Sequence, residues 1–121
     1  MKILVVDDDK DIQKMFKDIL EKCGGYQVTQ ADDGKGALIE YQESKPDIVL
    51  MDILMPHVDG IESTKKILKQ DKNAKIVVVT AAGKPGLEEM CIEAGAKMFI
   101  KKPFKINYLL DVIQKVSRGV V

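Results

Sequence analysis

Apolar and polar positions along the chain follow two patterns that take turns. Five short runs rich in apolar residues are typical of β-strands, and between them apolar residues recur at steps of three and four, as in amphipathic helices. The predicted strands are residues 2–6, 26–31, 47–52, 75–81 and 97–101. Regular alternation of strand and helix implies right-handed crossovers, and therefore an α/β fold with a parallel sheet covered by helices on both faces.

The strands differ in how far they are buried. Residues 3–6, 48–51 and 76–79 are continuously apolar, which indicates central strands buried on both sides, whereas 26–31 alternates like a half-buried or edge strand. The helices predicted between the strands face inward with Ile12, Met15, Phe16, Ile19, Leu20 and Cys23, then Ala37, Leu38 and Tyr41, then Ile61, Thr64, Ile67 and Leu68, then Leu87, Met90, Cys91 and Ala94, and last Ile106, Leu109, Leu110, Ile113 and Val116.

Local signals mark the helix ends. Asp9 and Asp33 suit N-caps, and the pair Gly24 and Gly25 suits the end of the first helix. Pro85 is expected in the first turn of the fourth helix. Gly60 is expected to support a left-handed turn before the third helix.

Length and composition narrow the class of protein. The 121 residues suit one domain spanning 1–121, with 45% hydrophobic residues and 19 basic residues balanced by 19 acidic ones. A zero net charge gives no overall attraction to nucleic acid or to an anionic membrane. No apolar run approaches the ~20 residues that span a bilayer, so a cytoplasmic protein is expected. Cys23 and Cys91 lack metal-site spacing and are expected to be reduced core thiols.

Reactive side chains follow the predicted strands at one edge of the sheet. Asp7 and Asp8 follow the first strand, Asp52 ends the third, Thr80 lies at the end of the fourth and Lys102 follows the fifth. Ligand sites in open parallel sheets form at this carboxyl edge. Two carboxylates ~4 Å apart repel by ~4 kcal/mol at an effective dielectric of ~20, so a hard divalent cation such as Mg²⁺ is expected between them.

The remaining groups at this edge suit a phosphoryl group. Lys102 supplies a mobile positive charge and Thr80 a hydroxyl donor, both of which bind phosphate oxygens. Asp52 is an oxygen nucleophile that is able to accept the phosphoryl group covalently. The residues alone therefore predict Mg²⁺-assisted transfer of a phosphoryl group onto Asp52.

Four sequence blocks carry a family resemblance over essentially the whole chain. "LVVDDD" at Leu4, "DIVLMDILMPHVDG" at Asp47, "VVVTAA" at Val77 and "FIKKPF" at Phe99 resemble, in order and spacing, the signature blocks of the receiver domain of two-component response regulators. The resemblance implies a chemotaxis-receiver-like, flavodoxin-like (βα)5 fold with strand order 2-1-3-4-5. It also implies a signalling domain, not an enzyme with a separate substrate, that takes a phosphoryl group from a phosphohistidine.

The resemblance assigns roles to individual residues. Asp52 matches the phosphoacceptor, and the metal, Mg²⁺ or Mn²⁺, is held by Asp7, Asp8, Asp52 and the backbone carbonyl of Leu54. Lys102 matches the lysine that pairs with the phosphoryl group, through a cis bond to Pro103. Thr80 and Phe99 match the switch hydroxyl and the switch aromatic.

Partners also follow from the resemblance. The phosphoryl donor is a sensor histidine kinase or a histidine phosphotransfer protein, expected to dock near the first helix and residues 103–106. The output surface is the fourth helix, fifth strand and fifth helix, through which the chain acts as a monomer or weak dimer on a downstream target or output domain. No direct contact with nucleic acid or membrane is expected. Whether the chain stands alone or begins a longer regulator stays open.

Two departures from the family pattern bear on behaviour. Phe99 stands where a tyrosine is frequent, which removes a phenolic hydrogen bond to partners. Leu54 and Ala82 flank the site with apolar side chains that are unable to orient a water molecule, so slow loss of the phosphoryl group is expected.

Other interpretations are weaker. The spacing Asp7-x-Asp9-x-Asp11 is superficially similar to a calcium-binding loop, but Ile12 occupies the glycine position. A phosphohydrolase with an aspartyl-phosphate intermediate needs a second acid two residues after the nucleophile, where Leu54 stands. A flavin-binding carrier of similar topology must cradle a phosphate after the first strand, where "DDDKD" would repel it. His57, the only histidine, is expected to be merely exposed.

Overall fold

The computed structural model describes residues 1–53 and 60–120. Within these residues the chain forms one parallel sheet with strand order β2-β1-β3-β4-β5, as predicted. The strands are β1 (Lys2–Val6), β2 (Gln27–Ala31), β3 (Ile48–Met51), β4 (Ile76–Thr80) and β5 (Met98–Lys101). The helices between and after them are α1 (Lys10–Gly24), α2 (Gly34–Ser44), α3 (Gly60–Gln70), α4 (Leu87–Glu93) and α5 (Ile106–Ser117).

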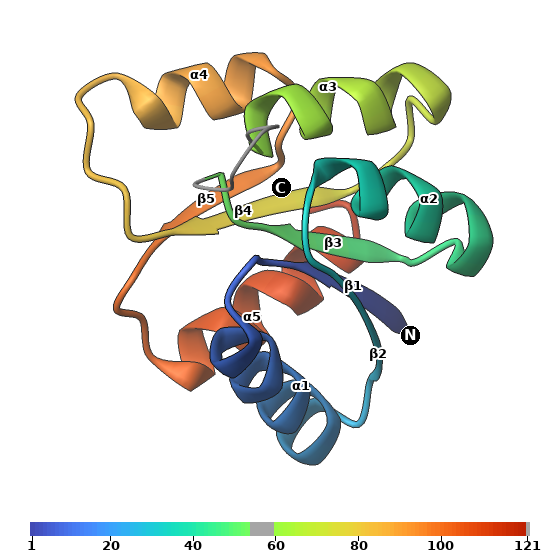
Figure 1. Cartoon of the computed structure of the whole chain (residues 1–121). Helices are drawn as coiled ribbons and strands as arrows, with labels where there is room; N and C mark the ends of the chain where they lie inside the picture. The colour runs from blue at the N-terminus through green and yellow to red at the C-terminus, as the bar shows by residue number, and fades with distance from the viewer. Residues whose placement is uncertain (54–59, 121) are drawn as a thin grey trace.

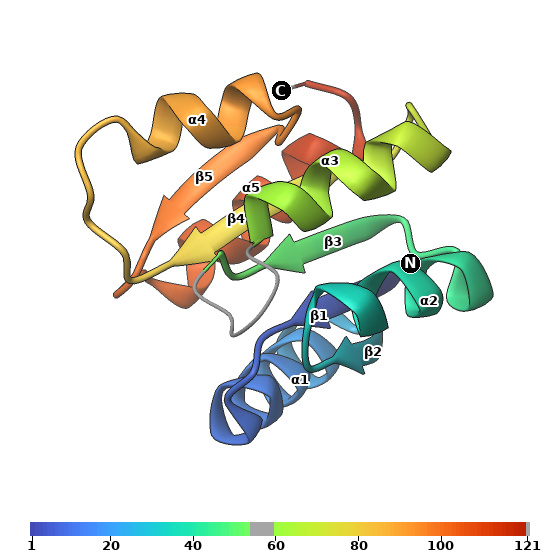
Figure 2. The same ribbon diagram turned by 45° about the horizontal axis from the view of Figure 1, so that its top comes forward.

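The helices divide between the two faces of the sheet. α1 and α5 cover one face, and α2, α3 and α4 cover the other (Figures 1 and 2). Alternate residues of each central strand point to opposite faces, so Ile3 and Val5 pack under α1 and α5 while Leu4 and Val6 pack under α2 and α3. The continuous apolar runs are thereby confirmed as strands buried on both sides.

The predicted helix ends are mostly confirmed. The Asp9 carboxylate accepts hydrogen bonds from the backbone N–H groups of Asp11 and Ile12, and that of Asp33 accepts one from Gly36. The prediction for Pro85 is wrong by two residues, because α4 begins at Leu87. Gly86 between them has φ of 79°, which is not helical, so the helix begins only after it.

Several residues predicted to be in the core are exposed: Met15, Cys23, Met90 and Ile106. In α1, at about 100° per residue, Met15 lies far around the helix from the buried Phe16 and Leu20. Cys23 lies in the last turn of α1. The core prediction for these four residues is wrong. Hydrophobic periodicity assigns a residue to one face of a helix, but it does not tell whether the sheet extends beneath the turn of the helix that carries the residue. Cys91 is buried, as predicted.

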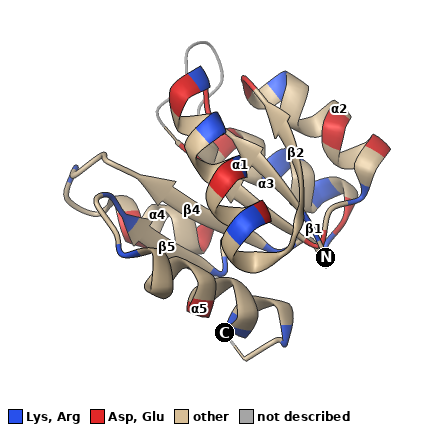
Figure 3. Ribbon diagram, turned by 90° about the horizontal axis from the view of Figure 1, so that it is seen from below, with Lys and Arg blue, Asp and Glu red and all other residues tan. Residues whose placement is uncertain are grey.

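The surface of α1 mixes both signs of charge. Lysines are interspersed with Asp and Glu along this helix (Figure 3). No helix within residues 1–53 and 60–120 has the length and apolarity to cross a bilayer.

Candidate functional site

The backbone hydrogen bonds of the sheet bring three of the predicted site residues to one edge. Asp52 directly follows β3, and its backbone N–H donates to the carbonyl of Val6 at the end of β1 (3.0 Å). Lys102 directly follows β5, and its N–H donates to the carbonyl of Thr80 at the end of β4 (2.8 Å). Because all these strands are parallel, their carboxyl ends deliver the side chains that follow them to the same place.

Three carboxylates converge there. One carboxylate oxygen from each of Asp7, Asp8 and Asp52 lies within 4.8 Å of the others. Asp7 is buried, Asp52 is half-buried and Asp8 is exposed, so the cluster opens to solvent on the Asp8 side. Oxygen donors of this kind are the ligands that Mg²⁺ prefers, usually one or two carboxylates completed by water. The donor set therefore fits a hard divalent cation; Leu54 lies outside the described residues.

The Lys102 ammonium completes the cluster. Its Nζ lies 3.3 Å from Asp7 Oδ2 and 3.8 Å from Asp52 Oδ2, and 5.9 Å from the centroid of the Phe16 ring. The peptide bond from Lys102 to Pro103 is cis, as predicted. Three carboxylates against one ammonium leave an excess of two negative charges, which a divalent cation would neutralise.

Burial raises the pKa of Asp7 above its ordinary value, and repulsion by Asp52 acts in the same direction. A hydrogen bond from the backbone N–H of Asp9 and the charge of Lys102 partly oppose this rise. A cation bound beside Asp7 would also oppose it, because a positive charge favours the ionised carboxylate.

The two predicted switch residues lie on the α4 side of the sheet. Thr80 is fully buried, and its hydroxyl accepts a hydrogen bond from the backbone N–H of Ala82 (3.2 Å). Phe99 on β5 is half-buried. Ala82 and Phe99 both pack against a cluster formed by Ile53, Val78, Leu87, Cys91 and Ala96. Thr80 is therefore linked, through Ala82, to the cluster against which Phe99 packs.

Gly60 acts differently from the prediction. It is the first residue of α3 and its φ is not positive, so the expected left-handed turn is wrong. A Cβ at this position would lie 2.6 Å from Ile53 Cα and would also meet the carbonyl oxygen of Asp52. The position requires glycine because α3 begins in contact with the backbone of the site.

One polar residue at the site escaped the sequence analysis. Gln13 on α1 is 3% exposed, and its side-chain amide donates to the backbone carbonyl of Asp7. Gln13 stands three residues before Phe16 and seven before Leu20, both buried on the same helix. A polar residue at the helical spacing of buried apolar residues indicates a buried polar contact. This signal in the sequence could have identified Gln13. His57, like Leu54, lies outside the described residues.

Comparison with known proteins agrees with this geometry. The family model "Response regulator receiver domain" matches residues 3–114. Chemotaxis protein CheY of Thermotoga maritima is 44% identical over 97% of this chain and 98% of its own length. Sporulation initiation phosphotransferase F of Bacillus subtilis is 36% identical over 94% of this chain and 91% of its own.

A solved structure shows the same fold. Response regulator protein TrrA from Thermotoga maritima, in complex with Mg²⁺ and BeF, superposes with a TM-score of 0.86 at 32% identity, covering 95% of this chain and 97% of that one. The family model spans nearly the whole chain, and the relatives align over nearly their full length. The chain therefore belongs to the response regulator receiver domain family of two-component signalling systems.

Proposed function

We propose that Asp52 accepts a phosphoryl group from a phosphohistidine on a sensor histidine kinase or a histidine phosphotransfer protein, in a reaction that requires Mg²⁺. The observation that carries the proposal is the set of contacts around Asp52. Its carboxylate shares a 4.8 Å cluster with Asp7 and Asp8, and its Oδ2 lies 3.8 Å from the Lys102 ammonium. A nucleophile, a cation site and a phosphate-binding cation thus lie side by side.

The transfer step needs an in-line nucleophile and neutralised charge. An oxygen of the Asp52 carboxylate forms a bond to phosphorus while the bond from phosphorus to the histidine nitrogen breaks, and its electron pair stays with the departing imidazole. A divalent cation, when bound, would supply charge neutralisation for this transfer. Asp7, Asp8, Asp52 and the carbonyl of Leu54 are the groups proposed to hold it, and Mn²⁺ is proposed to substitute for Mg²⁺ through the same oxygens.

Lys102 has two successive roles in this proposal. In the unphosphorylated protein its ammonium pairs with Asp7 and Asp52. Phosphorylation replaces the Asp52 carboxylate by a group of roughly −1.5 to −2 charge with three acceptor oxygens. The Lys102 ammonium then pairs with a phosphoryl oxygen. In this proposal the domain promotes only its own phosphorylation and dephosphorylation.

Thr80 and Phe99 are proposed to transmit the change. The Thr80 hydroxyl turns from the N–H of Ala82 toward the phosphoryl group, since a charged acceptor makes the stronger hydrogen bond. Ala82 and Phe99 pack on the same cluster, so the ring of Phe99 then moves inward. The surface formed by α4, β5 and α5 carries this state to a downstream protein or output domain, or to a second copy in a weak dimer.

An apolar pocket supports the proposed donor site. A pocket of about 500 Å³ lies between α1 and the segment after β5, lined by Met15, Ile19, Lys102, Pro103, Phe104 and Ile106. Met15 and Ile106 are 39% and 43% exposed, and the two lie together in this apolar pocket, as contiguous apolar surface at an interaction site does. Lys102 belongs both to this pocket and to the carboxylate cluster, so a phosphohistidine protein seated here reaches Asp52. Residues 1–121 are proposed to act as one receiver domain.

Intact-mass measurement after incubation with acetyl phosphate and Mg²⁺ tests the proposal. One phosphoryl group is expected on the parent protein, none on Asp52→Asn, and none on the parent when a chelator removes Mg²⁺. An absent adduct on the parent, an undiminished adduct on Asp52→Asn, or an adduct that ignores the chelator would contradict it.

A further inference from the structure

The side-chain amide of Gln13 lies beside the carboxylate cluster, against the backbone carbonyl of Asp7. Neither the family match nor the relatives' names give this residue a role. We infer that Gln13 is a positioning residue, which holds the β1–α1 segment so that Asp7 and Asp8 meet the metal in their working geometry. This inference rests on the proposed function. The residue belongs to α1, where it is buried together with Phe16 and Leu20.

The Gln13 amide is shared among three oxygens. Besides the carbonyl of Asp7, Nε2 contacts the carbonyl of Ala31 at 3.2 Å and Asp32 Oδ1 at 2.8 Å. An amide has only two hydrogens, so the three acceptors compete for them. The backbone of Gln13 is itself held, because Gln30 Nε2 donates to its carbonyl at 3.1 Å. The group is therefore fixed at both its backbone and its side chain.

The contacts of Gln13 continue the hydrogen bonding between β1 and β2 beyond the last residue pair of the sheet. The last pair in the β1–β2 register is Val6 with Ala31, and the N–H of Asp7 still donates to the Ala31 carbonyl (3.1 Å). The carbonyl of Asp7 points beyond the ladder, and a buried carbonyl without a partner is costly. The Gln13 amide donates to the Asp7 carbonyl and also to the Ala31 carbonyl. It thereby joins the end of β1 to the end of β2.

Asp7 is consequently held on every side. Its N–H is bound by Ala31, its carbonyl by Gln13, its Oδ1 by the N–H of Asp9 (2.9 Å) and its Oδ2 by Lys102 (3.3 Å). Three of these partners also serve the sheet, the helix cap or the catalytic charge. Gln13 is the partner that reaches the Asp7 peptide from a side chain of α1, and this peptide carries Asp8 as its next residue.

A second ion pair secures the outer end of the amide. Hydrogen bonds from Lys10 and Gln13 lower the pKa of Asp32, with the Lys10 contact the larger cause. Lys10 Nζ lies 2.8 Å from Asp32 Oδ1. Gln13 therefore lies between the exposed β2–α2 connection and the buried Asp7, and it couples the position of one to the other.

The test replaces Gln13 by methionine, which has a similar length and no donor. Gln13→Met is expected to bind Mg²⁺ roughly tenfold more weakly, as is usual when a group that orients a metal ligand is lost. Calorimetric titration of the unphosphorylated protein with Mg²⁺ measures this directly. With acetyl phosphate, the Mg²⁺ concentration giving half the maximal rate should rise by the same factor, while the rate at saturating Mg²⁺ changes little.

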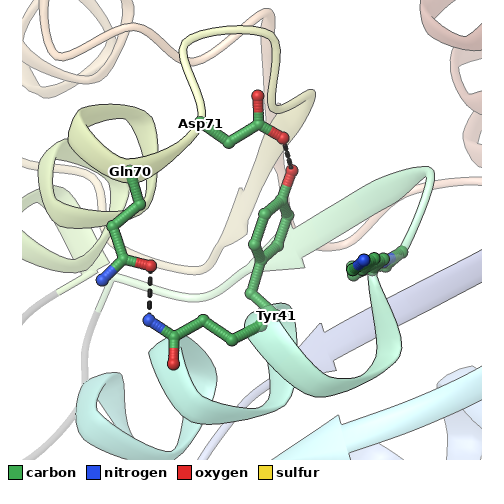
Figure 4. A pocket seen from close by; sticks show the side chains of 6 residues that line it. Tyr41, Gln70 and Asp71 are labelled. Carbon is green, nitrogen blue, oxygen red and sulfur yellow. Dashed lines mark hydrogen bonds between the residues drawn. The ribbon is translucent and has the colours of Figure 1, made fainter.

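Tyr41→Phe is the matched control. The Tyr41 hydroxyl donates to Asp71 Oδ2 (2.8 Å) in a pocket between the ends of α2 and α3 (Figure 4). That pocket lies by Pro46, at the start of β3 and thus at the sheet edge opposite the carboxylates. The control also loses a hydrogen bond made by a buried side chain, and its Mg²⁺ affinity is expected to stay that of the parent.

The outcomes separate the inference from the proposed function. A parent that shows neither Mg²⁺ binding nor an adduct overturns both. A parent that shows both, with Gln13→Met matching Tyr41→Phe in Mg²⁺ affinity, overturns the role of Gln13 alone. Should Gln13→Met fail to fold, Gln13→Asn carries the same test, because its amide is one methylene shorter and is withdrawn from Asp7; the same weakening is expected.

Discussion

At the scale of single residues, Lys102 and a bound cation compete for the same oxygens. The ammonium lies 3.3 Å from Asp7 and 3.8 Å from Asp52, and its side chain is only 17% exposed. Charges in such a place interact more strongly than on an open surface, because less water screens them. Lys102 therefore opposes binding of the cation while it favours arrival of the phosphoryl group.

Lys102→Met is expected to affect these two properties in opposite directions. Mg²⁺ should bind at least as tightly as in the parent, because a neighbouring positive charge is gone. Phosphorylation by acetyl phosphate at saturating Mg²⁺ should be on the order of a hundredfold slower, as when a group that stabilises transition-state charge is removed. Calorimetric titration and the rate of adduct formation measure the two effects.

The neighbouring Lys101 supplies the control, since it is exposed and ends β5. Lys101→Met should leave both quantities close to the parent values. Weaker Mg²⁺ binding in Lys102→Met, or a phosphorylation rate equal to that of Lys101→Met, would mean that Lys102 does not have the proposed role.

At the scale of elements, the start of α3 is built against the phosphoacceptor. The N–H of Gly60 donates to the carbonyl of Ile53 (3.3 Å), and the Thr64 hydroxyl donates to the carbonyl of Gly60 (2.7 Å). The first bond joins the helix to the segment that follows β3, and the second lies within the first turn of the helix. Asp52 is consequently positioned from one side by the sheet and from the other by α3.

Gly60→Ala should therefore disturb both stability and the site. Its Cβ would lie 2.6 Å from Ile53 Cα and 2.8 Å from Ile53 Cγ2, so backbone must shift. The free energy of unfolding in urea is expected to fall by about 1–3 kcal/mol, with slower phosphorylation of Asp52. Gly83→Ala is the control, because its Cβ would meet only the mobile end of Lys101. Equal stability of the two variants would contradict this account of α3.

The contact between α2 and the end of α3 makes a pH-dependent contribution. Burial raises the pKa of Tyr41, and the hydrogen bond to Asp71 and the charge of that carboxylate raise it further. As pH rises through about 10, the ordinary pKa of tyrosine, the unfolded chain loses this proton while the folded chain keeps it. Stability contributed by Tyr41 is therefore lost as pH rises above that value.

Urea unfolding of the parent and Tyr41→Phe across this pH range checks the contribution. At neutral pH the variant should be less stable by about 1 kcal/mol, the usual worth of one hydrogen bond. The difference should shrink as pH rises above about 10, because only the parent has the tyrosine to ionise. A constant difference across the range would show that Tyr41 titrates alike in both states.

At the scale of the whole molecule, the sequence predicted the sheet and the site's charged residues for one physical reason. Parallel strands deliver whatever follows them to one edge, so strand ends and residue types sufficed to bring Asp7, Asp8, Asp52 and Lys102 together. The strand order itself came from the family resemblance, and the structure confirms it.

What the sequence did not predict depends on contacts between elements. Gln13 serves the site from a helix and faces carbonyls of two strands, a relation that periodicity within α1 does not express. Gly60 was assigned a turn because glycine permits one, whereas the structure uses its missing side chain. Met15 and Ile106 were assigned to the core because they are apolar, yet they line a surface pocket beside Lys102.

The central claim is that this arrangement makes Asp52 the phosphoacceptor. The most direct measurement phosphorylates the protein with acetyl phosphate and Mg²⁺, reduces the acyl phosphate with borohydride, and locates the reduced residue by tandem mass spectrometry. The account predicts that Asp52 alone is converted to homoserine. Conversion of Asp7, Asp8 or any other carboxylate in place of Asp52 would contradict it, as would the absence of any conversion.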